Sequence, residues 1–311
     1  MPADICGVGF NTGDMNGDLD ALDRELESFA ALGCDACEIT AVGLDVVVSG
    51  RLIPARVKAL RAILGRYEFA YSQHAPIAIN LMDLAHLDLH VSAALAAITL
   101  AGETGTPVVV LHPGRVHPKD WATSSTELLA RERDVLSTVA DRAAQLGVRI
   151  AYENISPNPR VLAGAEWSYA LDPAQLAGQL EALSHGAVMA CLDVSHAQQG
   201  AGLMGFNINT ACAALTPHIG HIHFSDCTGL PATISTQHPG EREWLGIGDM
   251  HAPPGFGTID FPALAAAIGV QPNTRIVIEV KRNFHAHARS TSLEAARTFG
   301  ASIARPSDKT R

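Results

Sequence analysis

The sequence has no apolar run long enough to cross a membrane. Its 311 residues contain no stretch of about 18 consecutive apolar residues, the length that a membrane-spanning helix needs. The first residues, Met1 to Cys6, also lack the basic and apolar stretches of a secretory signal. Both absences favour a cytoplasmic protein without a membrane-spanning segment.

Cysteine is scarce, and basic residues are outnumbered. Of six scattered cysteines, Cys34 and Cys37 form the one pair with the spacing of a redox or zinc motif, so we expect reduced thiols. The 22 Lys and Arg residues stand against 32 Asp and Glu residues, a net charge of −10. Because binding to a phosphate backbone needs a basic surface, this balance argues against a nucleic-acid partner. Metal ions at an acidic site would offset part of the charge locally.

A regular alternation of apolar and amphipathic segments runs along the whole chain. Short apolar runs predict strands at residues 5–10, 36–40, 68–74, 108–112, 148–153, 188–193, 219–224 and 275–280. Helical periodicity and capping residues predict helices at 18–32, 54–64, 84–104, 126–146, 173–183, 208–215, 260–268 and 291–303.

This alternation predicts a single-domain (β/α)₈ TIM barrel over residues 1–305, followed by a disordered tail at 306–311. The alternative, a doubly wound open sheet, is expected to carry a glycine-rich phosphate turn after an early strand, and the sequence has none.

Potential metal ligands stand at the ends of six successive predicted strands and in the long loop after the seventh. The active site of a TIM barrel lies at the carboxyl ends of its strands. Four carboxylates and five imidazoles at one rim would repel and desolvate one another unless cations compensate them. We therefore expect a divalent metal site, and this mixture of ligands suits zinc, manganese or iron. The nine candidates are His74, His112, Glu153, Asp193, His196, His223, Asp249, His251 and Glu279.

Each candidate also has a structural explanation when it is taken alone. A histidine at a strand end is usually hydrogen-bonded structure, and Glu279 has Lys281 close by as an ion-pair partner. Asp193 is placed to cap a helix. The hypothesis of a metal site therefore depends on the whole set and not on any one member.

Short motifs around these residues resemble the endonuclease IV group of the xylose isomerase-like TIM-barrel superfamily, which also includes sugar isomerases and epimerases. The motifs that carry the resemblance are His74-Ala75-Pro76 with Ile79-Asn80-Leu81, His112-Pro113-Gly114, Glu153-Asn154, Leu192-Asp193-x-x-His196, His223-x-x-Asp226, Asp249-x-His251, Gly255 to Phe261, and Glu279. They follow the same order along nearly the whole chain.

The resemblance implies up to three zinc ions, with manganese, iron or magnesium as alternatives. One ion would be held by His74, His112 and Glu153, and a third by His196, Asp249 and His251. Glu153 would bridge to a second ion, held also by Asp193, His223 and Glu279. Single-metal isomerases and epimerases of the superfamily need only these last four residues. We expect Asn154, Asp226 and the inward-pointing His221 to contact the ligands and not the metal.

The sequence departs from the endonucleases where they contact DNA. Ile77 occupies the place of an aromatic wedge, and Ile155-Ser156-Pro157 follows Glu153-Asn154 in place of their Thr-Ala-Gly. The loop at 227–250 is longer and differently composed. We therefore expect a small-molecule substrate, with DNA a poor substrate or none.

Three functions follow from this pattern. The first is a phosphoester hydrolase with a trinuclear centre, acting on a small molecule of the sugar-phosphate type, with Glu153, Glu279 and His251 as catalytic residues. The alternative is a single-metal isomerase or epimerase of a sugar or polyol, in which Glu153 and Glu279 move protons. The third is a non-catalytic metal-binding barrel. The sequence leaves open whether the chain forms a homodimer.

Overall fold

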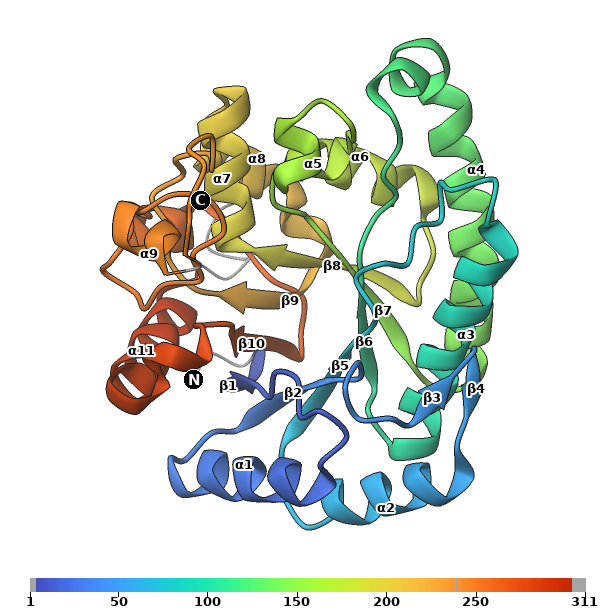
Figure 1. Ribbon diagram of the computed structural model, residues 1–311, viewed down its shortest axis with the longest axis vertical. Helices are drawn as coiled ribbons and strands as arrows, with labels where there is room; N and C mark the ends of the chain where they lie inside the picture. The colour runs from blue at the N-terminus through green and yellow to red at the C-terminus, as the bar shows by residue number, and fades with distance from the viewer. Residues whose placement is uncertain (1–3, 239, 304–311) are drawn as a thin grey trace, which may run out of the picture.

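The computed structural model describes residues 4–238 and 240–303, and its central feature is a closed barrel of parallel strands (Figure 1). Around the barrel the order is β1-β10-β9-β8-β7-β6-β5-β2. The strands are β1 (Ile5–Asn11), β2 (Ala36–Thr40), β5 (Ala70–His74), β6 (Val108–Leu111), β7 (Arg149–Glu153), β8 (Val188–Asp193), β9 (Ile219–Phe224) and β10 (Thr274–Ile278). A separate hairpin of β3 (Val47–Val48) and β4 (Arg51–Leu52) follows β2.

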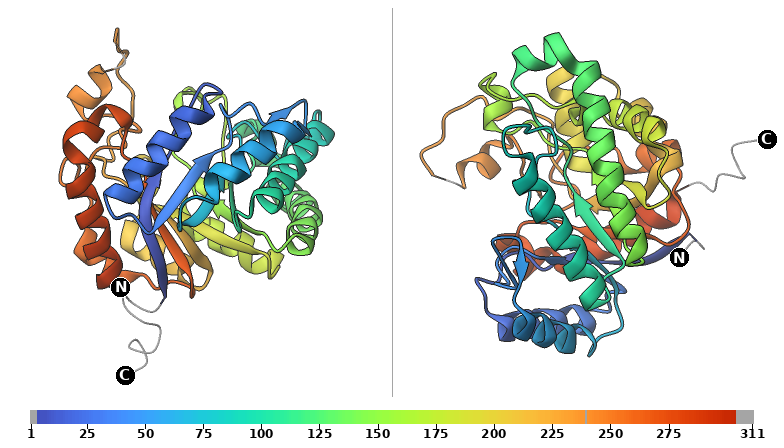
Figure 2. Two further views of the ribbon diagram at one scale, coloured as in Figure 1. Left: turned by 90° about the horizontal axis from the view of Figure 1, so that it is seen from below. Right: turned by 90° about the vertical axis from the view of Figure 1, so that its right-hand side faces the viewer.

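Helices surround the strands on the outside of the barrel (Figures 1 and 2). The longer ones are α1 (Leu19–Ala31), α2 (Pro54–Leu64), α3 (Leu87–Thr104), α4 (Pro118–Gln145), α6 (Pro173–Leu183), α7 (Val194–Met204), α8 (Ile208–Leu215) and α11 (His285–Ser302). Shorter helices are α5 (Pro159–Leu162), α9 (Glu241–Leu245) and α10 (Phe261–Ala267). None of the helices in the described part of the chain combines the length and apolarity needed to span a membrane.

The strands form because their apolar runs can be buried on both faces. All four residues of β6 are buried, since one face packs inside the barrel and the other under the helices. Helix α1 shows the complementary pattern. Its Leu22, Leu26 and Phe29 are buried at helical spacing, and the Asp18 side chain caps its first turn by accepting the Ala21 N–H at 2.9 Å.

The predicted (β/α)₈ barrel is confirmed. Helices α2, α6 and α8 and strands β2, β8 and β9 have the predicted bounds, whereas α4 begins at Pro118 and not at Thr126. Helix α7 was not predicted, because it starts directly at the end of β8 without an intervening loop. Asp193 ends the strand and caps the helix, accepting the His196 N–H at 2.7 Å. The predicted tail at 306–311 lies outside the described residues.

Candidate metal centre

Four side chains from four adjacent strands meet at the carboxyl end of the barrel. Glu153 ends β7, Asp193 ends β8, His223 lies on β9, and Glu279 follows β10. Each offers one ligand atom, and these atoms all lie within 4.8 Å of one another. The Nδ1 atom of His223 is 2.9 Å from Glu153 Oε1, 3.4 Å from Glu279 Oε2 and 3.9 Å from Asp193 Oδ2. We call these four residues the four-ligand set.

The oxygens of this set fit a divalent cation. Glu153 Oε2 and Asp193 Oδ2 are buried, and neither forms a hydrogen bond of good geometry within residues 4–238 and 240–303. A buried carboxylate oxygen without a partner costs free energy unless a cation or donor compensates it. Three carboxylates and one imidazole are ligands that zinc, manganese and iron accept. The residues present therefore match the metal site that the sequence predicts.

Three members of the four-ligand set have raised pKa values and so favour their protonated forms. Burial raises the pKa of Asp193 and of Glu279 above their usual range. Burial opposes the charged form of His223 too, but the negative groups around it hold its pKa well above the ordinary value. Because a metal binds the deprotonated ligands, a cation entering this site displaces protons.

Two further imidazoles approach Glu153 from β5 and from the residue after β6. Glu153 Oε2 lies 3.0 Å from His112 Nε2 and 3.4 Å from His74 Nε2. His74 Nδ1 donates to the carbonyl of Ala75 at 2.8 Å, so its other nitrogen faces Glu153. Burial lowers the pKa of His112, whereas for His74 the nearby carboxylates, with Glu153 first among them, outweigh burial and raise the pKa to about 9.

The remaining predicted ligands form a neighbouring group on the other side of Asp193. Asp249 Oδ2 is 3.1 Å from His251 Nε2 and 3.6 Å from His196 Nε2. Ligand atoms of Asp193, His196 and His251 also lie within 4.8 Å of one another. Seven of the nine predicted ligands line one cavity of about 420 Å³. The other two, Asp193 and His223, are fully buried and adjoin the cavity through Glu153 and Glu279.

Asn154 and Asp226 hold the backbone that carries the ligands. The Asn154 side chain accepts the Asp193 N–H and donates to the Asp193 carbonyl, both at 2.9 Å. Asp226 lies farther out and accepts N–H groups of Gly255 at 2.8 Å and Gly257 at 2.9 Å. A Cβ atom on Gly257 would lie 2.1 Å from Asp226 Oδ1, so this contact requires glycine. Asp226 therefore shapes the loop that bears Asp249 and His251.

Glu38 on β2 belongs to the site and was not predicted. Its side chain is fully buried, with Oε1 3.1 Å from His223 Nε2. Asn11 donates to Glu38 Oε1 at 2.9 Å and to Glu279 Oε1 at 3.2 Å, which links Glu38 to the four-ligand set. The sequence signal was a single acid in the middle of an otherwise uncharged strand, Ala36-Cys37-Glu38-Ile39-Thr40.

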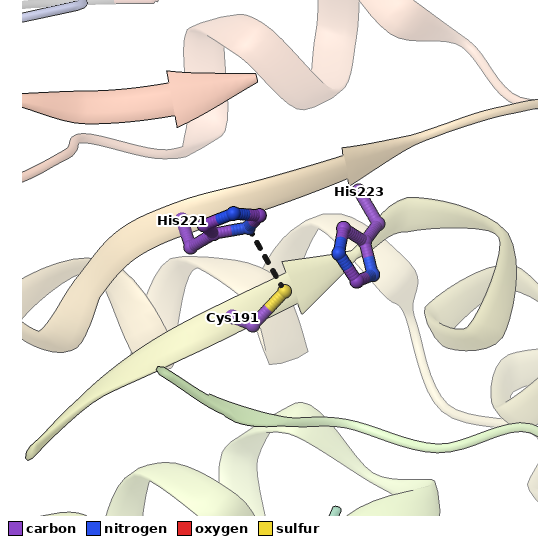
Figure 3. Close-up of side chains that lie close together, drawn as sticks. All are labelled: Cys191, His221 and His223. Carbon is purple, nitrogen blue, oxygen red and sulfur yellow. Dashed lines mark hydrogen bonds between the residues drawn. The ribbon is translucent and has the colours of Figure 1, made fainter. Parts of the chain in front are cut away.

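Cys191 and His221 precede Asp193 and His223 by two positions on β8 and β9, and they face each other inside the barrel (Figure 3). Cys191 Sγ lies 3.4 Å from His221 Nδ1, and His221 Nε2 lies 3.0 Å from Ser72 Oγ and 3.2 Å from Glu38 Oε2. Burial raises the pKa of Cys191 and lowers that of His221, which favours a neutral thiol that donates to a neutral ring. This layer is a continuous hydrogen-bond chain that ends on Glu38.

The sequence model of the family described as xylose isomerase-like TIM barrel matches residues 26–299. The chain belongs to this family. The resemblance stated from the sequence motifs is therefore confirmed at the level of the xylose isomerase-like TIM barrel, while the match leaves the number of metal ions open. An uncharacterized protein of Methanocaldococcus jannaschii is 32% identical over 148 residues, or 47% of this chain. The match spans 48% of that relative, about half its length.

Solved structures of the same fold cover almost the entire xylose isomerase-like barrel. A D-tagatose 3-epimerase-like protein has a TM-score of 0.69 and 21% identity, over 98% of this chain and 100% of its own. An L-ribulose 3-epimerase has a TM-score of 0.66 and 16% identity, over 96% and 95%. An IolI protein with a zinc atom has a TM-score of 0.65 and 19% identity, over 96% and 97%. At these identities the likenesses show the fold alone.

Proposed function

We propose that the chain is an epimerase or isomerase of a sugar or sugar-like polyol and holds one divalent cation on Glu153, Asp193, His223 and Glu279. The observation that carries this proposal is the four-ligand set itself, with its ligand atoms within 4.8 Å and two of its buried oxygens without a well-formed hydrogen bond among the described residues. Two structural neighbours, a D-tagatose 3-epimerase-like protein and an L-ribulose 3-epimerase, and the zinc of a third, the IolI protein, support it.

The two glutamates are placed to move a proton at the carbon next to a substrate carbonyl. They come from β7 and β10, the outer two of the four adjacent strands, and so approach a substrate from different sides. One carboxylate removes the proton from one face and the other returns a proton to the opposite face. Asn11 orients Glu279 and His112 orients Glu153. A bound cation would polarise the carbonyl and a neighbouring hydroxyl.

The cavity suits a small molecule. Its volume of about 420 Å³ falls in the range of roughly 300–1,000 Å³ usual for small-ligand pockets. Ile77, 60% exposed, stands at its edge, where the endonucleases that the sequence resembles carry an aromatic wedge. A small polyol, and not duplex DNA, is therefore the proposed substrate.

Phosphoester hydrolysis by up to three ions is the second candidate. The observation in its favour is the neighbouring group of His196, Asp249 and His251, which the single-metal proposal does not need as ligands. This was the leading hypothesis from the sequence. The similar structures favour the alternative, since two bear epimerase names.

The test combines metal analysis with proton exchange. The purified protein is loaded with zinc, manganese or magnesium, its bound metal is counted, and it is incubated with a panel of ketoses in D₂O. We expect near one equivalent of metal and deuterium at the carbon next to the carbonyl. Near three equivalents with hydrolysis of a phosphoester and no exchange would favour the second candidate. Bound metal with neither activity would favour a non-catalytic barrel.

A further inference from the structure

One arginine lines the cavity of the metal centre. Arg115 lies three residues beyond His112, in the loop between β6 and α4, and is half-buried. Within the described part of the chain it is the only Lys or Arg among the residues that line this cavity; the other charged or titratable groups there are carboxylates and imidazoles. Its side chain is therefore the one permanent positive charge that borders the cavity among residues 4–238 and 240–303.

Both ends of Arg115 are fixed in place. The Asn80 side chain accepts the Arg115 backbone N–H at 2.9 Å and donates to its carbonyl at 2.7 Å. The guanidinium donates through Nη2 to the carbonyl of Ile77 at 2.8 Å. This accounts for Asn80 in the Ile79-Asn80-Leu81 motif, which reaches no metal ligand but holds the Arg115 backbone. A guanidinium fixed in this way loses little entropy when it binds a ligand.

The charge of Arg115 has no carboxylate partner, unlike other cations near the carboxyl ends of the strands. Arg160 pairs with Glu166 at 2.9 Å, and Lys281 pairs with Glu243. Across residues 4–238 and 240–303, Arg115 forms no ion pair within 4 Å. Burial lowers the pKa of the Arg115 guanidinium, which reflects the cost of its desolvation. A rigid, partly desolvated and unpaired guanidinium favours an anion that can accept two parallel hydrogen bonds.

Arg115 also borders a second cavity, of about 460 Å³, on the side of α4. The carboxylates of Asp83, Asp120 and Glu127 line that cavity, and its other arginine, Arg131, is paired with Glu127 at 2.6 Å. Two carboxylates therefore remain there to disfavour an anion. In the metal cavity Glu153 and Glu279 are proposed metal ligands, and a cation would offset their charge. The third carboxylate there, Asp249, lies 3.1 Å from His251 and 3.6 Å from His196. The charge distribution therefore directs an anionic group to the metal side of Arg115.

We propose that Arg115 binds an anionic group of the substrate, a phosphate monoester or a carboxylate, and so selects acidic sugars or polyols over neutral ones. This inference rests on the proposed function of the metal cavity. The reacting carbon then lies at the four-ligand set, and Arg115 holds the charged end of the same molecule.

The experiment measures anion binding without turnover. Inorganic phosphate stands in for the phosphate ester and acetate for the carboxylate, each titrated by calorimetry into metal-loaded protein at constant ionic strength. Loss of a charged hydrogen-bond donor predicts that Arg115→Met weakens binding of the preferred anion about ten- to hundredfold. Arg115→Lys, which keeps the charge without the fork, should lie between the two. Arg66→Met is the matched control, because that arginine is already paired with Asp23 and lines neither cavity, and it should bind like the wild type.

Three results would overturn the inference: neither anion binds the wild type at millimolar concentration, Arg115→Met binds as tightly as the wild type, or Arg66→Met weakens binding equally. Melting curves show whether each variant is folded. If Arg115→Met does not fold, Arg115→Lys decides, and unchanged affinity in that variant would contradict a role for the fork. Tighter binding of phosphate would indicate a phosphate ester as the charged group of the substrate, and tighter binding of acetate would indicate a carboxylate. If no ketose exchanges a proton, the proposed function fails, but anion binding by Arg115 is still tested by calorimetry. If no anion binds, the role of Arg115 fails, but proton exchange with neutral ketoses can still occur.

Discussion

Two buried glutamates separated by one strand illustrate opposite uses of the same side chain. Glu132 on α4 and Glu153 at the end of β7 are 0% and 1% exposed. Glu132 accepts four hydrogen bonds, one each from the Gly114 N–H at 2.6 Å, the hydroxyls of Tyr152 and Tyr169 at 2.7 Å, and Gln179 Nε2 at 2.9 Å. Glu153 instead faces imidazoles and keeps Oε2 without a well-formed hydrogen bond among the described residues.

Successive side chains of β7 point to opposite faces of the strand, and this separates the two environments. Tyr152 points outward and donates to Glu132, and the next residue, Glu153, points into the barrel. Neutral donors fully satisfy Glu132, so its burial is explained by structure alone, with its pKa raised by burial. Burial of an acid therefore does not identify a functional site in this protein. The functional site is identified instead by a buried carboxylate that lacks some of its hydrogen-bond donors and lies next to other potential ligand atoms.

Removing one acid of the four-ligand set should have the largest effect. Asp193→Asn takes away a charged ligand whose Oδ2 is buried without a hydrogen bond. We expect metal affinity to fall by more than the roughly ten- to hundredfold that loss of an outer contact costs. Equilibrium dialysis with metal analysis measures this, and proton exchange should disappear with the metal.

Glu132→Gln is the matched control for that comparison. It places an NH₂ group against buried donors, which should cost about 1–3 kcal/mol of stability. Metal content should stay at the wild-type level, because Glu132 contacts tyrosines and not the set. Loss of metal in Glu132→Gln, or its retention in Asp193→Asn, would break the distinction between the two acids.

Glu38 tests whether a fully bonded acid also supports the centre. Its Oε1 lies 3.1 Å from His223 Nε2, while His223 Nδ1 faces Glu153. A carboxylate on the far nitrogen orients a ligating imidazole and raises its basicity. Glu38→Gln should therefore weaken metal binding by roughly ten- to hundredfold. Ser72→Ala removes the Ser72 hydrogen bonds to Glu38 and His221 but leaves the Glu38 carboxylate on His223, and it should have a smaller effect. Equal metal affinity in Glu38→Gln and wild type would show that Glu38 is structural, like Glu132.

The pH dependence of stability should have opposite signs with and without metal. Burial opposes protonation of His74 and His251, but Glu153 and Asp249 respectively raise the pKa of each from 6.5 to about 9. In the metal-free protein this stabilisation is complete below about pH 6.5 and is lost as the pH rises towards 9. Metal binding strengthens over the same range, because it needs deprotonated ligands. The difference in melting temperature between loaded and metal-free protein should therefore widen from pH 6.5 to 9. Parallel pH profiles would contradict this.

The sequence predicted the barrel well because buried parallel strands are continuous apolar runs. Strands β8 and β9 have their predicted bounds, and the nine strand-end and loop residues gather at one rim because a parallel barrel aligns its carboxyl ends. Helix α7 was missed because Asp193 serves both as strand end and as helix cap. Local patterns signal helix starts only where a loop separates the two elements.

The local sequence pattern could not predict contacts between residues that are distant in sequence. Glu38 and His223 are 185 residues apart, and barrel closure brings them together across its interior. Similarly, the clamp of Asn80 on Arg115 depends on how the loops after β5 and β6 pack. A lone acid or arginine carries no motif, so its role becomes visible only from its partners.

His251 provides the smallest expected effect and separates the two candidate functions. Its Nδ1 donates to the Glu279 carbonyl at 2.8 Å and its Nε2 lies 3.1 Å from Asp249, outside the four-ligand set. If one ion acts, His251→Ala removes a substrate contact. It should then raise KM about two- to tenfold, as loss of one hydrogen bond would, with metal content and kcat nearly unchanged. His185→Ala, whose partner Asp141 lies outside the cavity, is the control.

If three ions act, the same substitution removes a ligand of the third ion. Metal content should then fall, and loss of a positioned electrostatic stabiliser should lower kcat on the order of a hundred- to a thousandfold. The sequence alone favoured this second outcome. The four-ligand set now favours the first, because its atoms lie within 4.8 Å of one another without any contribution from His251. Counting bound metal beside kcat and KM for His251→Ala thus decides which of the two groups of ligands at this rim performs the chemistry.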